Sequence, residues 1–137
     1  MKRIQDRKSF AEILDSFGEE PLRRVLEKVP GWKGVEGLKV PSLLNAEQCS
    51  SAHTALYKAS LASRIAGPAA RVADLTGGLG VDSYFLSRVA SEVLYLERDP
   101  RLCEAAGSNF ALLGTCNIKI LNTTCGPDTG TKKHVYD

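Results

Sequence analysis

The side chains best placed to bind a ligand lie on either side of a run of glycines. Asp74 follows a short apolar run, and Thr76 leads into Gly77-Gly78-Leu79-Gly80. Glu97 ends a second apolar run, Val93-Leu94-Tyr95-Leu96. Glycines let a backbone approach a bound molecule closely, and an acidic residue at the tip of the second strand is the usual partner of ribose hydroxyls. The spacing therefore predicts a nucleoside-binding site around this loop.

Two classes of nucleotide are bound by such loops, and the residue spacing separates them. The dinucleotide fingerprint G-x-G-x-x-G, started at Gly78, would need a glycine where Ser83 stands, and Asp74 would repel a pyrophosphate. S-adenosylmethionine carries no phosphate, and its amino and sulfonium groups are cationic, so a neighbouring carboxylate favours it. The pattern indicates S-adenosylmethionine as the cofactor. An NAD-binding dehydrogenase domain is the disfavoured alternative, and an ordinary tight turn is the structural alternative for the glycines.

The chain resembles motifs I and II of class I S-adenosylmethionine-dependent methyltransferases at five positions: Asp74, Thr76, Gly78, Gly80 and Glu97. A closer resemblance rests on two phrases, EQCSSAHTALYKASLA (Glu47 to Ala62) and ADLTGGLGVDSYFLS (Ala73 to Ser87). Together they are similar to a bacterial group of proposed RNA methyltransferases, in which a THUMP-like domain follows the methyltransferase domain. The resemblance covers roughly residues 30–121 and implies a methyltransferase whose substrate is RNA.

The resemblance also implies roles for individual residues. Asp74 and the loop from Thr76 to Gly80 would hold the methionine moiety. Glu97 would bind the ribose hydroxyls, and Arg98 or Asp99 would flank the adenine. The EQCSS segment lies near the cofactor in that group, so its polar residues could cover the methionine part or shape the substrate mouth: Gln48, Ser50, Ser51, Thr54 and Lys58. The plain alternative for these five is helix capping and surface polarity. No residue of the chain is a convincing general base.

The chain departs from the family after its third predicted strand. Thr124 stands about where an adenine-binding aspartate is common, and Val135-Tyr136-Asp137 is typical of the opening of a fourth strand. The family's catalytic motif is expected at the end of that strand. We therefore expect an inactive fragment of a larger enzyme, with an open sheet edge through which the chain self-associates. A non-catalytic nucleotide-binding module is the alternative.

The predicted fold class is α/β, with a helical segment at residues 1–44 and a partial methyltransferase domain at residues 45–137. Apolar stripes predict a helix from Ser9 to Phe17 that Gly18 ends, and another from Pro21 to Val29. A long helix is expected from Ala46 to Ile65 with Asn45 as its N-cap. Strands near residues 72–75, 93–96 and 118–121 alternate with helices, which predicts right-handed crossovers and a parallel sheet. The resemblance implies that this sheet is Rossmann-like and has the order 3-2-1 with the start of strand 4.

Composition limits the remaining possibilities. The chain has 137 residues, a net charge of +2 and four cysteines without C-x-x-C pairing or metal-ligand spacing. These features predict no metal site, reduced thiols and a cytoplasmic protein without a membrane span. Trp32 is expected to be a packing anchor rather than a base-stacking platform. Arg23, Arg24 and Lys28 are expected to form a solvated face, with an RNA-facing patch as the alternative.

Overall fold

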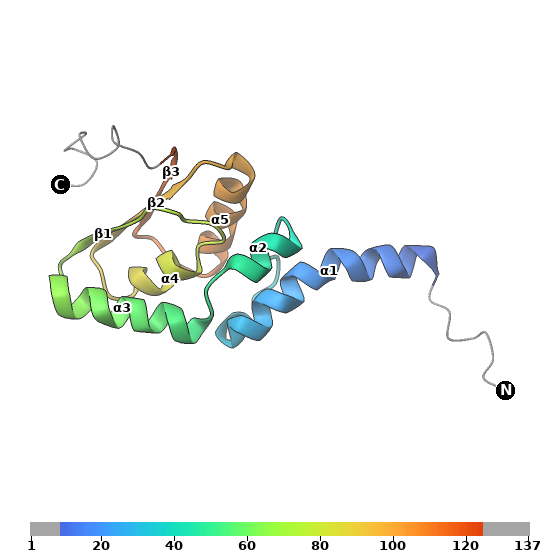
Figure 1. The fold of residues 1–137 in the computed structure, drawn as a ribbon, viewed down its shortest axis with the longest axis horizontal. Helices are drawn as coiled ribbons and strands as arrows, with labels where there is room; N and C mark the ends of the chain where they lie inside the picture. The colour runs from blue at the N-terminus through green and yellow to red at the C-terminus, as the bar shows by residue number, and fades with distance from the viewer. Residues whose placement is uncertain (1–8, 125–137) are drawn as a thin grey trace.

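The computed structural model of the chain describes residues 9–124 and shows a three-stranded sheet with helices packed on it (Figure 1). The elements follow the order expected for repeated strand–helix units, preceded by a helical segment. In chain order they are α1 (Phe10–Lys28), the 3-10 helix η2 (Pro30–Trp32), α2 (Leu43–Gln48), α3 (Ala52–Ala66), β1 (Arg71–Asp74), α4 (Val81–Ser87), β2 (Glu92–Glu97), α5 (Pro100–Leu112) and β3 (Ile118–Asn122).

The sheet is parallel and has the order β1-β2-β3, which confirms the predicted order 3-2-1. Val93 of the central strand pairs with Val72 on one side and with Ile118 on the other. Both crossovers move across the sheet in the same direction, so right-handed connections place α4 and α5 on the same face. β1 is an edge strand within residues 9–124, and self-association through it stays a prediction. The expected start of strand 4 lies outside the described residues.

The sequence predicts a helix that Asp99-Pro100 begins and Gly114 ends, and α5 confirms this prediction. Asp99 is its N-cap and its Oδ1 accepts a hydrogen bond of 2.9 Å from the Arg101 amide, while Pro100 takes the first helical position. Gly114 follows the helix with a φ of +77°. The apolar pattern predicts an inward face of five residues, of which four are buried and Leu113 is half-buried; the four are Leu102, Ala105, Ala106 and Phe110.

The expected division of the first helical region into two helices is wrong. A single helix, α1, runs through Gly18 and Pro21. An interior glycine costs a helix only about 1 kcal/mol relative to alanine, and a proline removes one backbone hydrogen bond, so neither must end a helix that packing holds in place. The packing comes from the predicted apolar stripe, in which Val25 and Val29 are fully buried.

The expected long helix from Ala46 to Ile65 is also wrong, because the segment forms two helices. Ser42, not Asn45, caps α2, and its Oγ accepts from the Asn45 amide at 3.1 Å. Ser51 caps α3 in the same way and accepts from the Thr54 amide at 3.2 Å. Between them Cys49 is extended. Serine side chains that bond nearby backbone groups compete with continuous helix, and here they break it.

The predicted inward face of this region is wrong for four of its six residues, whereas Cys49 packs against the core as predicted and Leu61 is half-buried. It placed Cys49, His53, Leu56, Tyr57, Leu61 and Ile65 against the domain. Leu56, Tyr57 and Ile65 are instead 54%, 61% and 80% exposed. Ala55 and Ala59 are the buried residues of α3, and Ala59 packs in a cluster with Leu86 and Phe85 of α4. Small side chains let the two helices approach closely, which an apolar-stripe argument overlooks.

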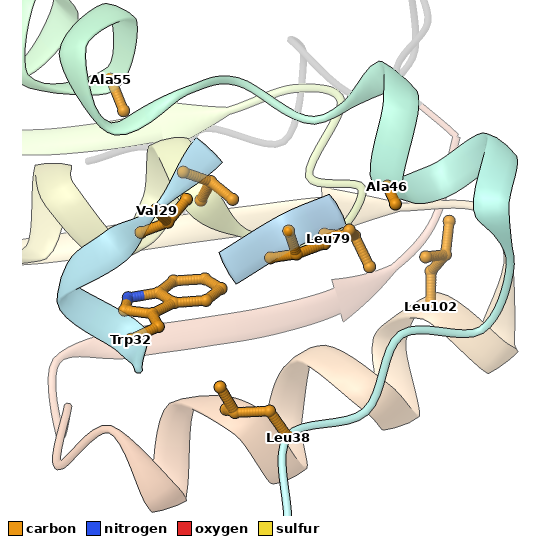
Figure 2. Packing of buried hydrophobic residues seen from close by; sticks show 9 residues of the cluster. Val29, Trp32, Leu38, Ala46, Ala55, Leu79 and Leu102 are labelled. Atoms are coloured by element: carbon orange, nitrogen blue, oxygen red, sulfur yellow. The ribbon is translucent and has the colours of Figure 1, made fainter. Parts of the chain in front are cut away.

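One hydrophobic cluster joins the N-terminal segment to the loop after β1 (Figure 2). It contains Val25, Val29, Trp32, Leu38, Ala46, Ala55, Leu79, Val81 and Leu102. Trp32 is 3% exposed and meets the Tyr84 ring edge-on, with ring centroids 5.4 Å apart, so it is a packing anchor as predicted. The domain boundary between residues 44 and 45 stays a prediction, although this cluster contains residues from both sides of it. In the described part of the chain, no helix has the length and apolar character needed to cross a bilayer.

Candidate cofactor-binding site

A cavity of about 380 Å³ lies between the glycine loop after β1, the end of β2 and the junction of α2 with α3. Such a volume is at the lower end of the range of small-molecule sites. The sequence predicted nine of its lining residues: Gln48, Ser50, Lys58, Thr76, Gly77, Gly78, Leu79, Gly80 and Glu97. Its other lining residues were missed: Asn45, Cys49, Val81, Asp82 and Leu102. The fold thus places the glycine loop, Glu97 at the end of β2 and residues of the α2–α3 region around one cavity.

The glycine loop is shaped by two aromatic rings beneath it. Gly78 and Gly80 have φ values of +55° and +87°, the left-handed region that favours glycine. A Cβ atom at Gly77 would overlap the Tyr95 ring, and one at Gly80 would overlap the Phe110 ring. These glycines are therefore required by packing as well as by any ligand above them. The sequence analysis favoured a ligand over a tight turn as the reason for these glycines, and it did not foresee the packing on Tyr95 and Phe110.

Glu97 links the end of β2 to the glycine loop. Its Oε1 accepts from the Gly78 amide at 3.1 Å, and its Oε2 accepts from the Asp99 amide at 2.8 Å. The Tyr95 hydroxyl donates to the Gly78 carbonyl, so two side chains of β2 hold the same loop residue. Each carboxylate oxygen has a second lone pair, which leaves Glu97 able to accept hydroxyl donors from the cavity.

Asp74 supports the loop but does not line the cavity. Its Oδ2 accepts from the Ser83 hydroxyl at 2.7 Å, and its Oδ1 accepts from the Thr76 amide at 3.4 Å. Ser83, at the position where a dinucleotide fingerprint needs glycine, is fully buried. Burial raises the pKa of the Asp74 carboxyl above its ordinary value of 3.8, against the hydrogen bond from Ser83, which lowers it.

The raised pKa of Asp74 predicts a pH-dependent stability. A carboxyl whose pKa rises on folding contributes stability that is full below the unfolded pKa and is lost as the pH rises through the folded pKa. Asp74→Asn should therefore gain in melting temperature over the wild type as the pH rises from 3.8 through the folded pKa. Asp99→Asn is the control of opposite sign, because the Arg101 amide lowers the pKa of Asp99. A pH-independent difference for Asp74→Asn would contradict this prediction.

Four predicted site residues lie outside the cavity wall: Asp74, Arg98, Ser51 and Thr54. Ser51 and Thr54 begin α3, where the Ser51 hydroxyl bonds the Thr54 hydroxyl at 3.1 Å as well as capping the helix. Both residues thus take part in the cap of α3, as the plain alternative expects, and their contact with a ligand stays a prediction. Arg98 is exposed, and its carbonyl accepts from the Asn122 amide side chain at 3.0 Å. This bond joins the ends of β2 and β3.

Asp82 is the charged lining residue that the sequence argument missed. Its Oδ2 accepts from Lys58 Nζ at 2.9 Å and from Ser50 Oγ at 3.1 Å, so it connects α4 to two of the five residues predicted to shape the substrate mouth. The available signal was its place directly after the glycine loop, at the first turn of a predicted helix. Its partners are 24 and 32 residues away in sequence, which no local pattern reveals.

The side chain of Lys28 makes different contacts from those of Arg23 and Arg24 on the same helix. The two arginines form exposed ion pairs with Glu20, as expected for a solvated face. Lys28 Nζ instead donates to three backbone carbonyls at the end of α2, those of Ala46, Glu47 and Cys49, at 2.9, 2.6 and 3.0 Å. Its assignment to the solvated face is wrong. The ammonium satisfies carbonyls that a helix end leaves unpaired, directly beside the cavity wall.

Lys28→Met should lower the free energy of unfolding by about 1.5–3 kcal/mol, the scale of hydrogen bonds to charged groups. Methionine keeps the apolar stem but leaves the carbonyls at the end of α2 without their donor. Chemical denaturation measures the loss, and Arg24→Met, which removes only an exposed ion pair, is the matched control. Equal stability of the two variants would show that the three carbonyl contacts contribute nothing.

Comparison with known proteins places this geometry in a known fold. No family model matches the chain. The structure of a "putative methyltransferase" from Porphyromonas gingivalis W83 is 34% identical with a TM-score of 0.66, over 87% of this chain and 29% of that chain. The chain has part of a Rossmann-like methyltransferase fold. The predicted fold class is confirmed by this likeness and by the parallel sheet.

Two further matches have a lower sequence identity or cover less of the chain. A "putative RNA methyltransferase" from Pyrococcus horikoshii is 23% identical with a TM-score of 0.54, over 72% of this chain and 50% of that chain, and it shows the fold alone. An uncharacterized protein of Methanothermobacter thermautotrophicus is 35% identical over 68 residues, 50% of this chain and 25% of that protein. The chain thus spans 29% of the Porphyromonas structure and 25% of the Methanothermobacter protein.

Proposed function

We propose that the chain is the cofactor-binding part of an S-adenosylmethionine-dependent methyltransferase. The observation that carries this proposal is the position of Glu97, which lines the same cavity as the glycine loop and holds the loop by the Gly78 amide. In parallel α/β sheets, ligands bind outside the carboxyl ends of the strands. A carboxylate at the end of β2 is then placed to accept both hydroxyls of a ribose.

The backbone donors of the loop favour a ligand without phosphate. The amides of Gly77, Gly78 and Gly80 already donate, to the Leu96 carbonyl at 2.7 Å, to Glu97 Oε1 and to the Gly77 carbonyl at 2.9 Å. A pyrophosphate needs such amides free, because they are what neutralises its charge. Asp82 and Glu97 add negative charge to the cavity wall. These features support S-adenosylmethionine over NAD.

The reaction would be transfer of a methyl group from the sulfonium of S-adenosylmethionine to a nucleophile in line with it. For such a displacement the protein chiefly supplies positioning. In this chain Glu97 would orient the ribose, the glycine loop would support the methionine part, and Tyr95 and Phe110 would keep the loop in place. The resemblance of EQCSS and DLTGGLGVD to RNA methyltransferases supports RNA as the acceptor, a THUMP-like partner domain and a cytoplasmic location.

Isothermal titration with S-adenosylhomocysteine and with NAD tests this proposal. The 137-residue chain should bind S-adenosylhomocysteine and release little or no heat with NAD. The Glu92→Ala variant, altered at the opposite end of β2, serves as the control and should bind like the wild type. Binding of NAD without binding of S-adenosylhomocysteine would favour the dinucleotide alternative, and binding of neither would overturn the proposal.

A further inference from the structure

Lys58 is the only basic side chain among the described residues that line the cavity. It comes from α3, and its Nζ lies 2.9 Å from Asp82 Oδ2 and 3.3 Å from Ser50 Oγ. These two contacts come from different elements and fix the direction of a long, flexible side chain. Lys58 is thus held at the cavity wall rather than extended into solvent.

The ammonium group of Lys58 has capacity for another acceptor. An ammonium has three N–H donors, and the contacts with Asp82 and Ser50 use two of them. The Lys58 side chain is 50% exposed and lines the cavity, so its third donor is open to a ligand there. The natural ligand of such a donor is an anionic oxygen.

The charged residues that line the cavity favour one class of anionic ligand over another. Lys58 and Asp82 together carry no net charge, and Glu97 adds a negative charge at the strand end of the same cavity. A phosphate would gain from Lys58 but would be repelled by both carboxylates. A group that carries a carboxylate and an ammonium on one carbon fits the pair better, because each of its charges meets an opposite one.

We propose that Lys58 binds the α-carboxylate of an amino-acid group attached to the nucleoside, and that the cavity thereby prefers nucleosides that carry this group. Asp82 and Ser50 act as positioning residues for Lys58. This inference rests on the proposed cofactor-binding function and adds to it the residue that binds the amino-acid part of the ligand. The binding of the ribose by Glu97 does not depend on it.

The test compares the binding of two ligands to the wild type and to three variants by isothermal titration. S-adenosylhomocysteine carries the amino-acid group, and 5′-deoxy-5′-methylthioadenosine has the same nucleoside without it. Lys58→Met should weaken S-adenosylhomocysteine binding by about tenfold, the scale of one hydrogen bond to a charged group, and leave methylthioadenosine binding unchanged. Lys33→Met, which removes an exposed lysine outside the cavity wall, should change neither, and Lys58→Arg should keep most of the preference.

The outcomes separate this inference from the function on which it rests. Equal losses for both ligands, or none, in a folded Lys58→Met variant would overturn the role of Lys58 while S-adenosylhomocysteine binding by the wild type upheld the proposed function. If Lys58→Met does not fold, decarboxylated S-adenosylhomocysteine decides the matter on the wild type. It should bind about tenfold more weakly than the parent compound, and equal binding would overturn the inference. Failure of the wild type to bind S-adenosylhomocysteine would overturn both.

Discussion

Gly80→Ala should lower the free energy of unfolding by about 2–5 kcal/mol. Gly80 has a φ of +87°, and a Cβ atom there would overlap the Phe110 ring. The left-handed backbone costs a non-glycine residue about 1–2 kcal/mol, and overpacking a buried site costs about 1–3 kcal/mol more. Because the loop lines the cavity, ligand binding should be lost with the native packing. Urea denaturation followed by circular dichroism measures the effect.

The matched control is Gly34→Ala. Gly34 has nearly the same φ, +88°, but no atom lies within 4 Å of where its Cβ would be. Gly34→Ala should therefore lower the free energy of unfolding only by the cost of the left-handed backbone, about 1–2 kcal/mol. The difference between the two variants isolates the overlap with Phe110. Equal losses at the two positions would mean that Phe110 does not pack under the loop, and that the glycine is needed for its backbone alone.

Glu97→Ala should weaken binding of S-adenosylhomocysteine by about 1.5–3 kcal/mol, which is about tenfold to a hundredfold in the dissociation constant. The variant removes the proposed acceptor of the ribose hydroxyls. It also removes the carboxylate that accepts from the Gly78 and Asp99 amides, so the loop loses one of its anchors. Titration at constant temperature, with Glu92→Ala as the reference, measures the change.

Tyr95→Phe separates the two roles of Glu97. The Tyr95 hydroxyl anchors the loop through the Gly78 carbonyl, and Tyr95 is fully buried and does not line the cavity. Its removal should lower stability and weaken ligand binding much less than Glu97→Ala does. If Tyr95→Phe and Glu97→Ala lose the same affinity, Glu97 acts only by holding the loop, and the ribose assignment is contradicted.

The strand–helix part of the fold could be predicted from local sequence. The apolar runs that became β1, β2 and β3, the Asp99-Pro100 start of α5 and the glycine turn each depend on residues close together in the chain. The helical region before β1 could not be predicted in detail. Ser42 and Ser51 cap two helices where the apolar pattern predicts one, and packing carries α1 through Gly18 and Pro21. Whether a helix continues or ends at such residues is decided by tertiary contacts, which the local sequence does not show.

The candidate site shows the same division. Its loop and Glu97 follow from a local motif, and their convergence on one cavity follows from the parallel sheet. The Lys28 contacts with the end of α2 and the Lys58–Asp82 ion pair join residues roughly twenty positions apart, so they depend on how helices dock. Asp74 was expected in the cavity, but the buried Ser83 hydroxyl draws its carboxylate to α4. The position of a residue at the end of a strand predicts the region in which its side chain lies, but not the group to which it hydrogen-bonds.

A crystal structure of the chain with S-adenosylhomocysteine tests the central claim most directly. The account predicts that the ligand lies over the loop Gly77-Gly78-Leu79-Gly80, with both ribose hydroxyls within hydrogen-bonding distance of the Glu97 carboxylate. Binding on another face of the molecule, or in this cavity with the ribose turned away from Glu97, would contradict it.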